Sequence, residues 1–155
     1  MSATAPTETG SNYTVGHFGP WNELDKFSVY SPLRKAEVLG RTFLKEVLGA
    51  TGSQISFNKL PPNEAVPYFH AHKLNEEIYI IVQGEGEFQV DEDVFPIKEG
   101  SAVRVACAGD RCLRNTSATV PMIYFCVQVM SGSLIQFNSQ DGIPGIRVAK
   151  WAEKS

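Results

Sequence analysis

Hydrophobic residues alternate with polar residues over several short stretches of the chain, and turn residues separate these stretches. In residues 54–60, for example, Ile55 and Phe57 lie between polar neighbours, and the stretch ends at Pro61-Pro62-Asn63. Alternation with a period of two, bounded by Pro, Gly, Asn or Asp, is typical of β-strands. The pattern predicts strands over residues 54–60, 77–83, 87–90, 94–97, 101–105 and 120–130.

The spacing of these strands predicts the class of fold. Many short strands at nearly regular intervals indicate an antiparallel all-β sandwich or barrel. Residues 134–137 and 146–148 are also strand-like, and we expect this C-terminal part to cover a sheet edge or to reach a partner subunit. No internal repeat, heptad pattern or Gly/Ser-rich linker divides residues 15–155, so we expect them to form a single domain.

The N-terminal part has a different composition. Its first residues are rich in Ser, Thr, Ala, Gly and Pro, and we expect a disordered tail over residues 1–14. Ser31-Pro32 has the form of a helix N-cap followed by Pro at the first helical position, which predicts a short N-terminal helix that Gly40 ends. Residues 41–48 fit neither the helical nor the strand pattern cleanly.

Composition excludes several functions. The 155 residues carry 14 Lys and Arg against 17 Asp and Glu, for a net charge of -3, whereas a nucleic-acid-binding protein normally has a basic patch. Apolar runs such as residues 78–82 are too short to cross a bilayer. The cysteines number 3 and include no CxxC pair. We therefore expect a cytoplasmic protein without disulfides that binds neither nucleic acid nor membrane.

Two histidines and one glutamate are candidate metal ligands. His70 and His72 are two residues apart, so on a strand their imidazoles would point to the same face. Glu77 begins the next predicted strand and can face the same side. Two imidazoles and one carboxylate form the facial set that binds Fe(II) and other divalent metals. A second interpretation stays open, in which the histidines lie half-exposed on an edge strand and Glu77 is solvated or paired with Lys73.

This segment resembles the first motif of the cupin superfamily, HxH-x4-E-x6-G, with its final glycine at Gly84. The resemblance covers roughly residues 50–130. It implies a double-stranded β-helix, also called a jelly-roll barrel, that is often dimeric and holds a metal deep inside. By this resemblance His70, His72 and Glu77 would bind a divalent transition metal such as Fe, Mn, Ni, Zn or Cu.

The second cupin motif is incomplete in this chain. Its usual histidine, the fourth metal ligand, is missing, although Gly100 and Asn115 can be placed. Counted forward from Gly109 the position of this histidine falls on Cys112, and counted back from Asn115 it falls on Arg111. A Cys112 thiolate would be a fourth ligand for zinc, whereas Arg111 would repel a metal and bind an anionic substrate group. The alternatives are a small buried Cys112 and a surface Arg111.

The residues and the resemblance together favour a metal-dependent enzyme that acts on a small polar or anionic molecule. Tyr79 shares a strand face with Glu77 and would line the pocket as a hydrogen-bond donor, unless it is simply a core aromatic residue. The missing fourth ligand keeps a second hypothesis open, a non-catalytic cupin that binds a small ligand with weak or no metal. We also expect a homodimer, by analogy with the family and because edge strands need to be covered.

Overall fold

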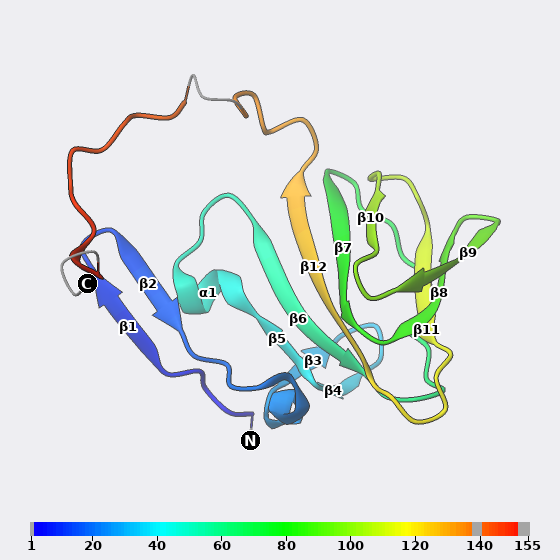
Figure 1. The fold of residues 1–155 in the computed structure, drawn as a ribbon. Coiled ribbons are helices and arrows are strands. Elements are labelled where there is room, and N and C mark those ends of the chain that lie inside the picture. The colour runs from blue at the N-terminus through cyan, green and yellow to red at the C-terminus, as the bar shows by residue number, and fades with distance from the viewer. Residues whose placement is uncertain (1, 138–140, 152–155) are drawn as a thin grey trace.

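A five-stranded antiparallel sheet forms the centre of the protein (Figure 1). The structure is a computed structural model, and it describes residues 2–137 and 141–151. The strand order in this sheet is β10-β7-β12-β6-β5. The strands are β5 (Arg41–Phe43), β6 (Gln54–Leu60), β7 (Asn75–Gln83), β10 (Ala102–Val105) and β12 (Met122–Met130).

A second, three-stranded sheet faces the first across a hydrophobic core. It contains β8 (Glu85–Val90), β9 (Asp93–Lys98) and β11 (Arg111–Asn115) in the order β11-β8-β9. Phe88 and Leu113 from this sheet pack with Tyr79 and Ile81 from the larger one in a single buried cluster. Within the described residues the two sheets stay separate, so their strands do not close into one continuous sheet.

The strands predicted from alternation are all present. β6 has the predicted bounds, and β12 begins at Met122, just after Pro121, which has no N–H to donate to a neighbouring strand. β11 was not predicted, because Arg111-Cys112-Leu113-Arg114-Asn115 is largely polar. Its residues nevertheless alternate between buried and less buried positions. The sheet therefore contains a buried polar strand that hydrophobicity alone does not reveal.

Two glycines permit the close connection between β7 and β8. Gly84 has a φ of 86°, in the region that favours glycine, and a Cβ there would lie 3.1 Å from the backbone of Met122. A Cβ on Gly86 would lie 2.0 Å from the carbonyl oxygen of Arg114 on the paired strand β11. The Gly-x-Gly that begins with the last glycine of the first motif is thus required by the packing of the backbone.

The N-terminal part departs from the expectation of a disordered tail. β1 (Thr7–Gly10) and β2 (Tyr13–Gly16) form a hairpin, with Thr7 paired with Gly16 and Gly10 with Tyr13. The low-complexity composition hid a two-residue turn flanked by Thr, Tyr and Val, which favour strands.

The helix expected after Ser31-Pro32 is also wrong. A hairpin of β3 (Ser28–Ser31) and β4 (Ala36–Leu39) occupies this place. The hydroxyl of Ser31 accepts a hydrogen bond from the backbone N–H of Arg34 at 3.3 Å, as an N-cap would, but Lys35 then takes a left-handed φ of 52° and the chain reverses. Ser-Pro opens turns as well as helices.

Short helical segments lie elsewhere in the N-terminal half. The 3₁₀ helix η1 spans Trp21–Lys26, and α1 spans Leu44–Leu48, directly after β5. Residues 41–48 are therefore part strand and part helix. The ring of Trp21 lies 5.2 Å from that of Phe57 and 5.3 Å from that of Phe125. These aromatic residues cover the outer face of β6 and β12. The inner face carries core residues such as Leu60 and Met122 as well as polar side chains.

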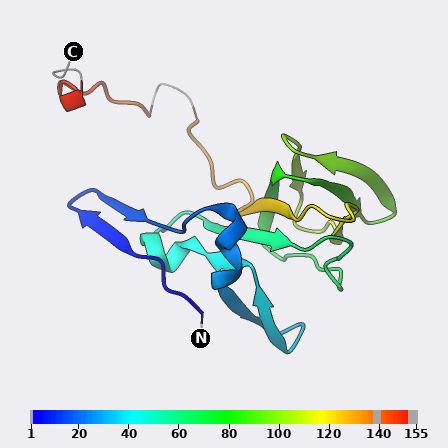
Figure 2. The ribbon, with the colours of Figure 1, turned by 60° about the horizontal axis from the view of Figure 1, so that its bottom comes forward.

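The C-terminal segment leaves the sheets after β12 (Figure 2). The strands expected over residues 134–137 and 146–148 are absent, and this prediction is wrong. Leu134 is 73% exposed and Ile146 is 99% exposed, so the apolar side chains that suggested strands have no contact here to bury them. Among residues 2–137 and 141–151, no helix combines the length and hydropathy needed for a membrane span.

Candidate functional site

Polar side chains gather on the inner face of the five-stranded sheet. Strand pairing places Asn58 between Arg41 on β5 and Tyr124 on β12. Alternate residues of a strand share a face, so the polar positions continue along it. They include Ser56, Cys126, Gln128, Tyr79 and Glu77. Burying polar groups between two sheets destabilises the fold unless they are hydrogen-bonded. A cluster of them on one face therefore calls for a function, and we take this face as the candidate site.

Glu77 on β7 is the most connected residue of the site. Its side chain is 8% exposed, and its Oε2 accepts a hydrogen bond from Tyr79 Oη at 2.5 Å. Arg111 donates to the same oxygen from Nε at 3.0 Å and from Nη2 at 2.9 Å. Burial raises the pKa of this carboxyl, but the adjacent His70 and Tyr79 and the charge of Arg111 outweigh it and lower the pKa well below the ordinary value. Glu77 is therefore ionised.

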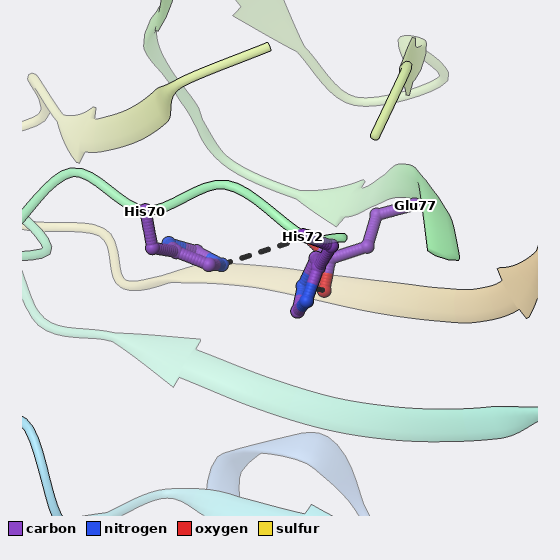
Figure 3. A group of neighbouring side chains, drawn as sticks. All are labelled: His70, His72 and Glu77. Carbon is purple, nitrogen blue, oxygen red and sulfur yellow. Dashed lines mark ion pairs between the residues drawn. The ribbon is translucent and has the colours of Figure 1, made fainter. Parts of the chain in front are cut away.

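His70 and His72 approach this carboxylate from an extended segment rather than from a regular strand. The backbone N–H of His70 donates to the carbonyl of Arg111 at 3.3 Å, and that of His72 to the carbonyl of Cys107 at 2.9 Å. Nε2 of His72 lies 3.1 Å from Oε1 of Glu77, and Nε2 of His70 lies 3.7 Å from Oε2 (Figure 3). One ligand atom from each residue lies within 4.8 Å of the others, so the three predicted ligands do converge.

The imidazoles contain buried nitrogen atoms without a hydrogen-bond partner. Nε2 of His72 is one, because its 3.1 Å approach to Glu77 lacks hydrogen-bond alignment, and Nδ1 of His70 is the other. The side-chain amide of Gln128 lies 3.4 Å from Nδ1 of His72. The amide nitrogen is the atom that faces Nδ1. With the amide turned by 180°, its oxygen would accept a hydrogen bond from the Nδ1–H group and leave the lone pair of Nε2 free for a metal. The residues present therefore fit a divalent metal.

Arg111 and Cys112 were both candidates for the missing histidine position, and the structure places Arg111 beside Glu77. The Arg111 side chain is fully buried and also donates from Nη1 to the carbonyls of Gly109, at 2.8 Å, and His70, at 3.2 Å. The thiol of Cys112 instead points to the carbonyl of Val66, at 2.9 Å, and burial raises its pKa. Cys112 is not in the cluster of ligand atoms found among the described residues.

A cavity of about 190 Å³ opens onto this cluster. Tyr79 lines it and donates a hydrogen bond from its hydroxyl to Glu77. Burial raises the pKa of Tyr79, so the phenol stays neutral. Sequence reasoning missed further polar lining residues, namely Arg41, Ser56, Tyr68, Tyr124, Cys126 and Gln128. The polar half of the alternation in residues 54–60 was the one available signal, since Ser56 faces the interior. No pattern in the sequence marked Arg41.

Comparisons with known proteins place this architecture in a family. A model described as the cupin domain matches residues 56–128. The chain is similar to a cupin protein from Bacteroides fragilis, with 34% identity over 68% of this chain and 89% of that one and a TM-score of 0.64. It is also similar to a predicted oxalate decarboxylase from Thermotoga maritima, with 28% identity over 62% and 83% of the two chains and a TM-score of 0.53.

A structure from Photorhabdus luminescens shares the fold at 13% identity, with a TM-score of 0.57, and covers 73% of this chain and 85% of that one. A comparison with curated proteins gives no match.

Proposed function

The chain belongs to the cupin superfamily, and from this premise we propose that it binds a divalent transition metal through His70, His72 and Glu77. In this proposal the two sheets are the walls of a jelly-roll barrel. The observation that carries the proposal is the buried, unpartnered Nε2 of His72, 3.1 Å from the ionised carboxylate of Glu77 and accompanied by His70. A metal ion would satisfy that nitrogen and neutralise the carboxylate together.

The donor set favours Fe, Mn, Ni, Zn or Cu, because imidazole and carboxylate groups suit these ions. When bound, the ion would act as a Lewis acid or activate oxygen. Only three protein ligands would hold it, which leaves coordination positions for water or substrate.

The surrounding residues orient the carboxylate. Tyr79 and Arg111 both donate to Oε2 of Glu77, so this oxygen is fixed and Oε1 is left on the side of His72. We propose that the protein is a metal-dependent enzyme acting on a small polar or anionic molecule in the cavity of about 190 Å³. The similarity to the Thermotoga maritima protein, a predicted oxalate decarboxylase, supports a small carboxylate as the substrate.

Arg111 also favours a second function. Its guanidinium lies 2.9 Å from Oε2 of Glu77, and a positive charge so close to the carboxylate weakens the attraction for a metal ion. A cupin that binds a small ligand without catalysis, with weak or no metal, is the alternative that this contact supports.

We further propose that the protein is a homodimer. Apolar side chains along the C-terminal segment, such as Ile135 at 85% and Phe137 at 81% exposure, are unusual in a monomer. A second copy would bury them. Light scattering coupled to size-exclusion chromatography measures the mass directly, and a mass of 17.0 kDa would exclude the dimer.

Metal analysis tests the main proposal. Protein purified without chelators or a metal-affinity step should contain about one Fe, Mn, Ni, Zn or Cu per chain, measured by inductively coupled plasma mass spectrometry. His72→Ala should lose most of this metal, whereas His17→Ala should retain it, because the imidazole of His17 is exposed and paired with Glu8 outside the site. Folded wild-type protein that takes up none of these ions would overturn the metal proposal and favour the alternative.

A further inference from the structure

We propose that Arg41 is the residue that binds the anionic group of the small molecule, a carboxylate or a phosphate. This inference deepens the proposed function, since it names the substrate class of the same cavity. It rests on that proposal only in placing a small molecule there, and it does not require a metal. Nothing in the sequence motifs marked Arg41, which belongs to neither cupin motif.

Strand pairing fixes the place of Arg41. It is the first residue of β5, an edge strand of the five-stranded sheet, and it pairs with Asn58 on β6. Its Nε donates to Oδ1 of Asn58 at 2.6 Å. Asn58 itself is 2% exposed and is held by bonds from its amide nitrogen to Ser56 and to the carbonyl of Tyr124. The guanidinium of Arg41 is thus anchored by Asn58, and Arg41 is one of the residues that line the cavity.

Arg41 has no carboxylate partner in the part of the chain that the structure describes. Three other arginines do form salt bridges there: Arg104 with Glu76, Arg111 with Glu77 and Arg114 with Glu87. Burial disfavours the charge of Arg41, but the neighbouring phenols of Tyr124 and Tyr68 favour it and the net effect raises the pKa. A half-buried guanidinium therefore stays charged without a counter-ion.

The charges of the whole cavity lead to the same ligand. Its lining contains two guanidinium groups, Arg41 and Arg111, and the carboxylate of Glu77, so these three groups leave an excess of positive charge. A metal ion would make it more positive. Such a cavity attracts anions, and a guanidinium is suited to bind two oxygens of a carboxylate or phosphate at once. The hydroxyls of Tyr68 and Tyr124 line the same cavity and are further donors.

Arg111 cannot replace Arg41 in this role. All three of its nitrogen atoms already donate hydrogen bonds, to Glu77, Gly109 and His70, and the side chain is 0% exposed. The sequence analysis considered Arg111 as the anion-binding residue, but the carboxylate of Glu77 already neutralises its charge. The available guanidinium is that of Arg41.

Binding of two small anions to metal-free protein tests this inference. Malonate, a carboxylate, and inorganic phosphate are titrated separately by isothermal titration calorimetry into wild-type protein, Arg41→Gln and Arg104→Gln. Both variants lose one positive charge, but Arg104 is exposed and pairs with Glu76 outside the cavity. We expect Arg41→Gln to bind the preferred anion about tenfold more weakly or worse, and Arg104→Gln to bind it as wild type does. The anion that binds more tightly shows whether the natural ligand carries a carboxylate or a phosphate.

Chemical modification of the wild-type protein provides a measurement that needs no variant. Phenylglyoxal reacts with accessible guanidinium groups, and the modified residue is identified by mass spectrometry. Malonate or phosphate should protect Arg41 severalfold while leaving the reaction of Arg104 unchanged. Equal affinity of Arg41→Gln and wild type, absence of binding to wild type, or equal reaction of Arg41 with and without anions would overturn the inference.

The outcome is separable from that of the metal proposal. Protein that binds no metal but binds malonate through Arg41 would refute the metal site and support the inference. Protein that binds metal through His72 while Arg41→Gln binds both anions normally would do the reverse.

Discussion

The two arginines of the cavity differ in what surrounds them, and the difference separates a structural charge from one available to a ligand. Arg111 is 0% exposed, and its guanidinium donates two bonds to the carboxylate of Glu77. Arg41 is half-buried, and its bonded neighbour across the sheet is the amide of Asn58. A charge removed from water requires compensation, so a charge that lacks it inside the protein is available for a ligand.

Strand neighbours create this difference. Arg111 is the first residue of β11 and reaches Glu77 on the inner face of β7. Arg41 lies on the edge strand β5, where the paired residue is Asn58. An amide oxygen orients a guanidinium without neutralising it. A carboxylate at position 58 would pair with Arg41 and remove the free charge.

Removing the partner of Arg111 should have the largest effect. Glu77→Gln leaves a fully buried guanidinium without its counter-ion, and we expect the free energy of unfolding of metal-free protein to fall by about 3 kcal/mol or more. Glu87→Gln, which breaks the exposed pair with Arg114, should cost about 1 kcal/mol or less. Urea denaturation followed by circular dichroism measures both. Equal losses would mean that burial does not distinguish the two pairs.

Replacing Arg111 with a metal-binding side chain should have an intermediate effect, on metal affinity. Arg111→His removes the positive charge next to Glu77 and adds an imidazole, so we expect Zn²⁺ to bind about tenfold more tightly or better. Competition with a chromophoric chelator measures the affinity. Arg104→His adds an imidazole outside the cavity and should leave the affinity as in wild type. Unchanged or weaker binding by Arg111→His would show that Arg111 does not oppose the metal.

Replacing Arg41 should have the smallest effect on stability. Arg41→Gln leaves no carboxylate unpaired, and the new amide can still donate to Asn58, so the free energy of unfolding should change by no more than about 1 kcal/mol. The same urea titration measures it. A loss as large as that of Glu77→Gln would mean that Arg41 is a structural charge after all, and the contrast between the two arginines would disappear.

Alternation revealed the strands that carry apolar side chains on at least one face. It predicted β6 and β12, in which Phe57 and Phe125 alternate with inward-facing residues. It missed β11, where Arg111 and Asn115 are buried along with Leu113, because burial of a polar residue depends on partners that are distant in sequence. Spacing predicted the convergence of His70, His72 and Glu77, although the histidines lie outside regular strands and their orientation depends on backbone bonds to Arg111 and Cys107.

The choice between Arg111 and Cys112 could not be made by counting, because the turn before β11 is one residue shorter than the motif requires. Pairing of β11 with β8 fixes the register, with Arg111 opposite Val90 and Cys112 opposite Gln89. A shift by one residue would exchange the faces of the two side chains. Arg41 could not be predicted from the sequence for a similar reason. A strand of three residues shows no alternation, and the neighbours of Arg41 depend on the pairing of β5 with β6.

The aromatic cluster on the outer face makes the protein its own optical reporter. Trp21 is one of 2 tryptophans in the chain, and its indole packs on Phe57 and Phe125. Their neighbours along the strands, Ser56 and Tyr124, line the cavity. With Trp151 replaced by Phe, all indole fluorescence would arise from Trp21, on the outer face of the sheet that contains Arg41. Shifts in its emission on adding an anion or a metal would then follow events inside the cavity without any attached dye.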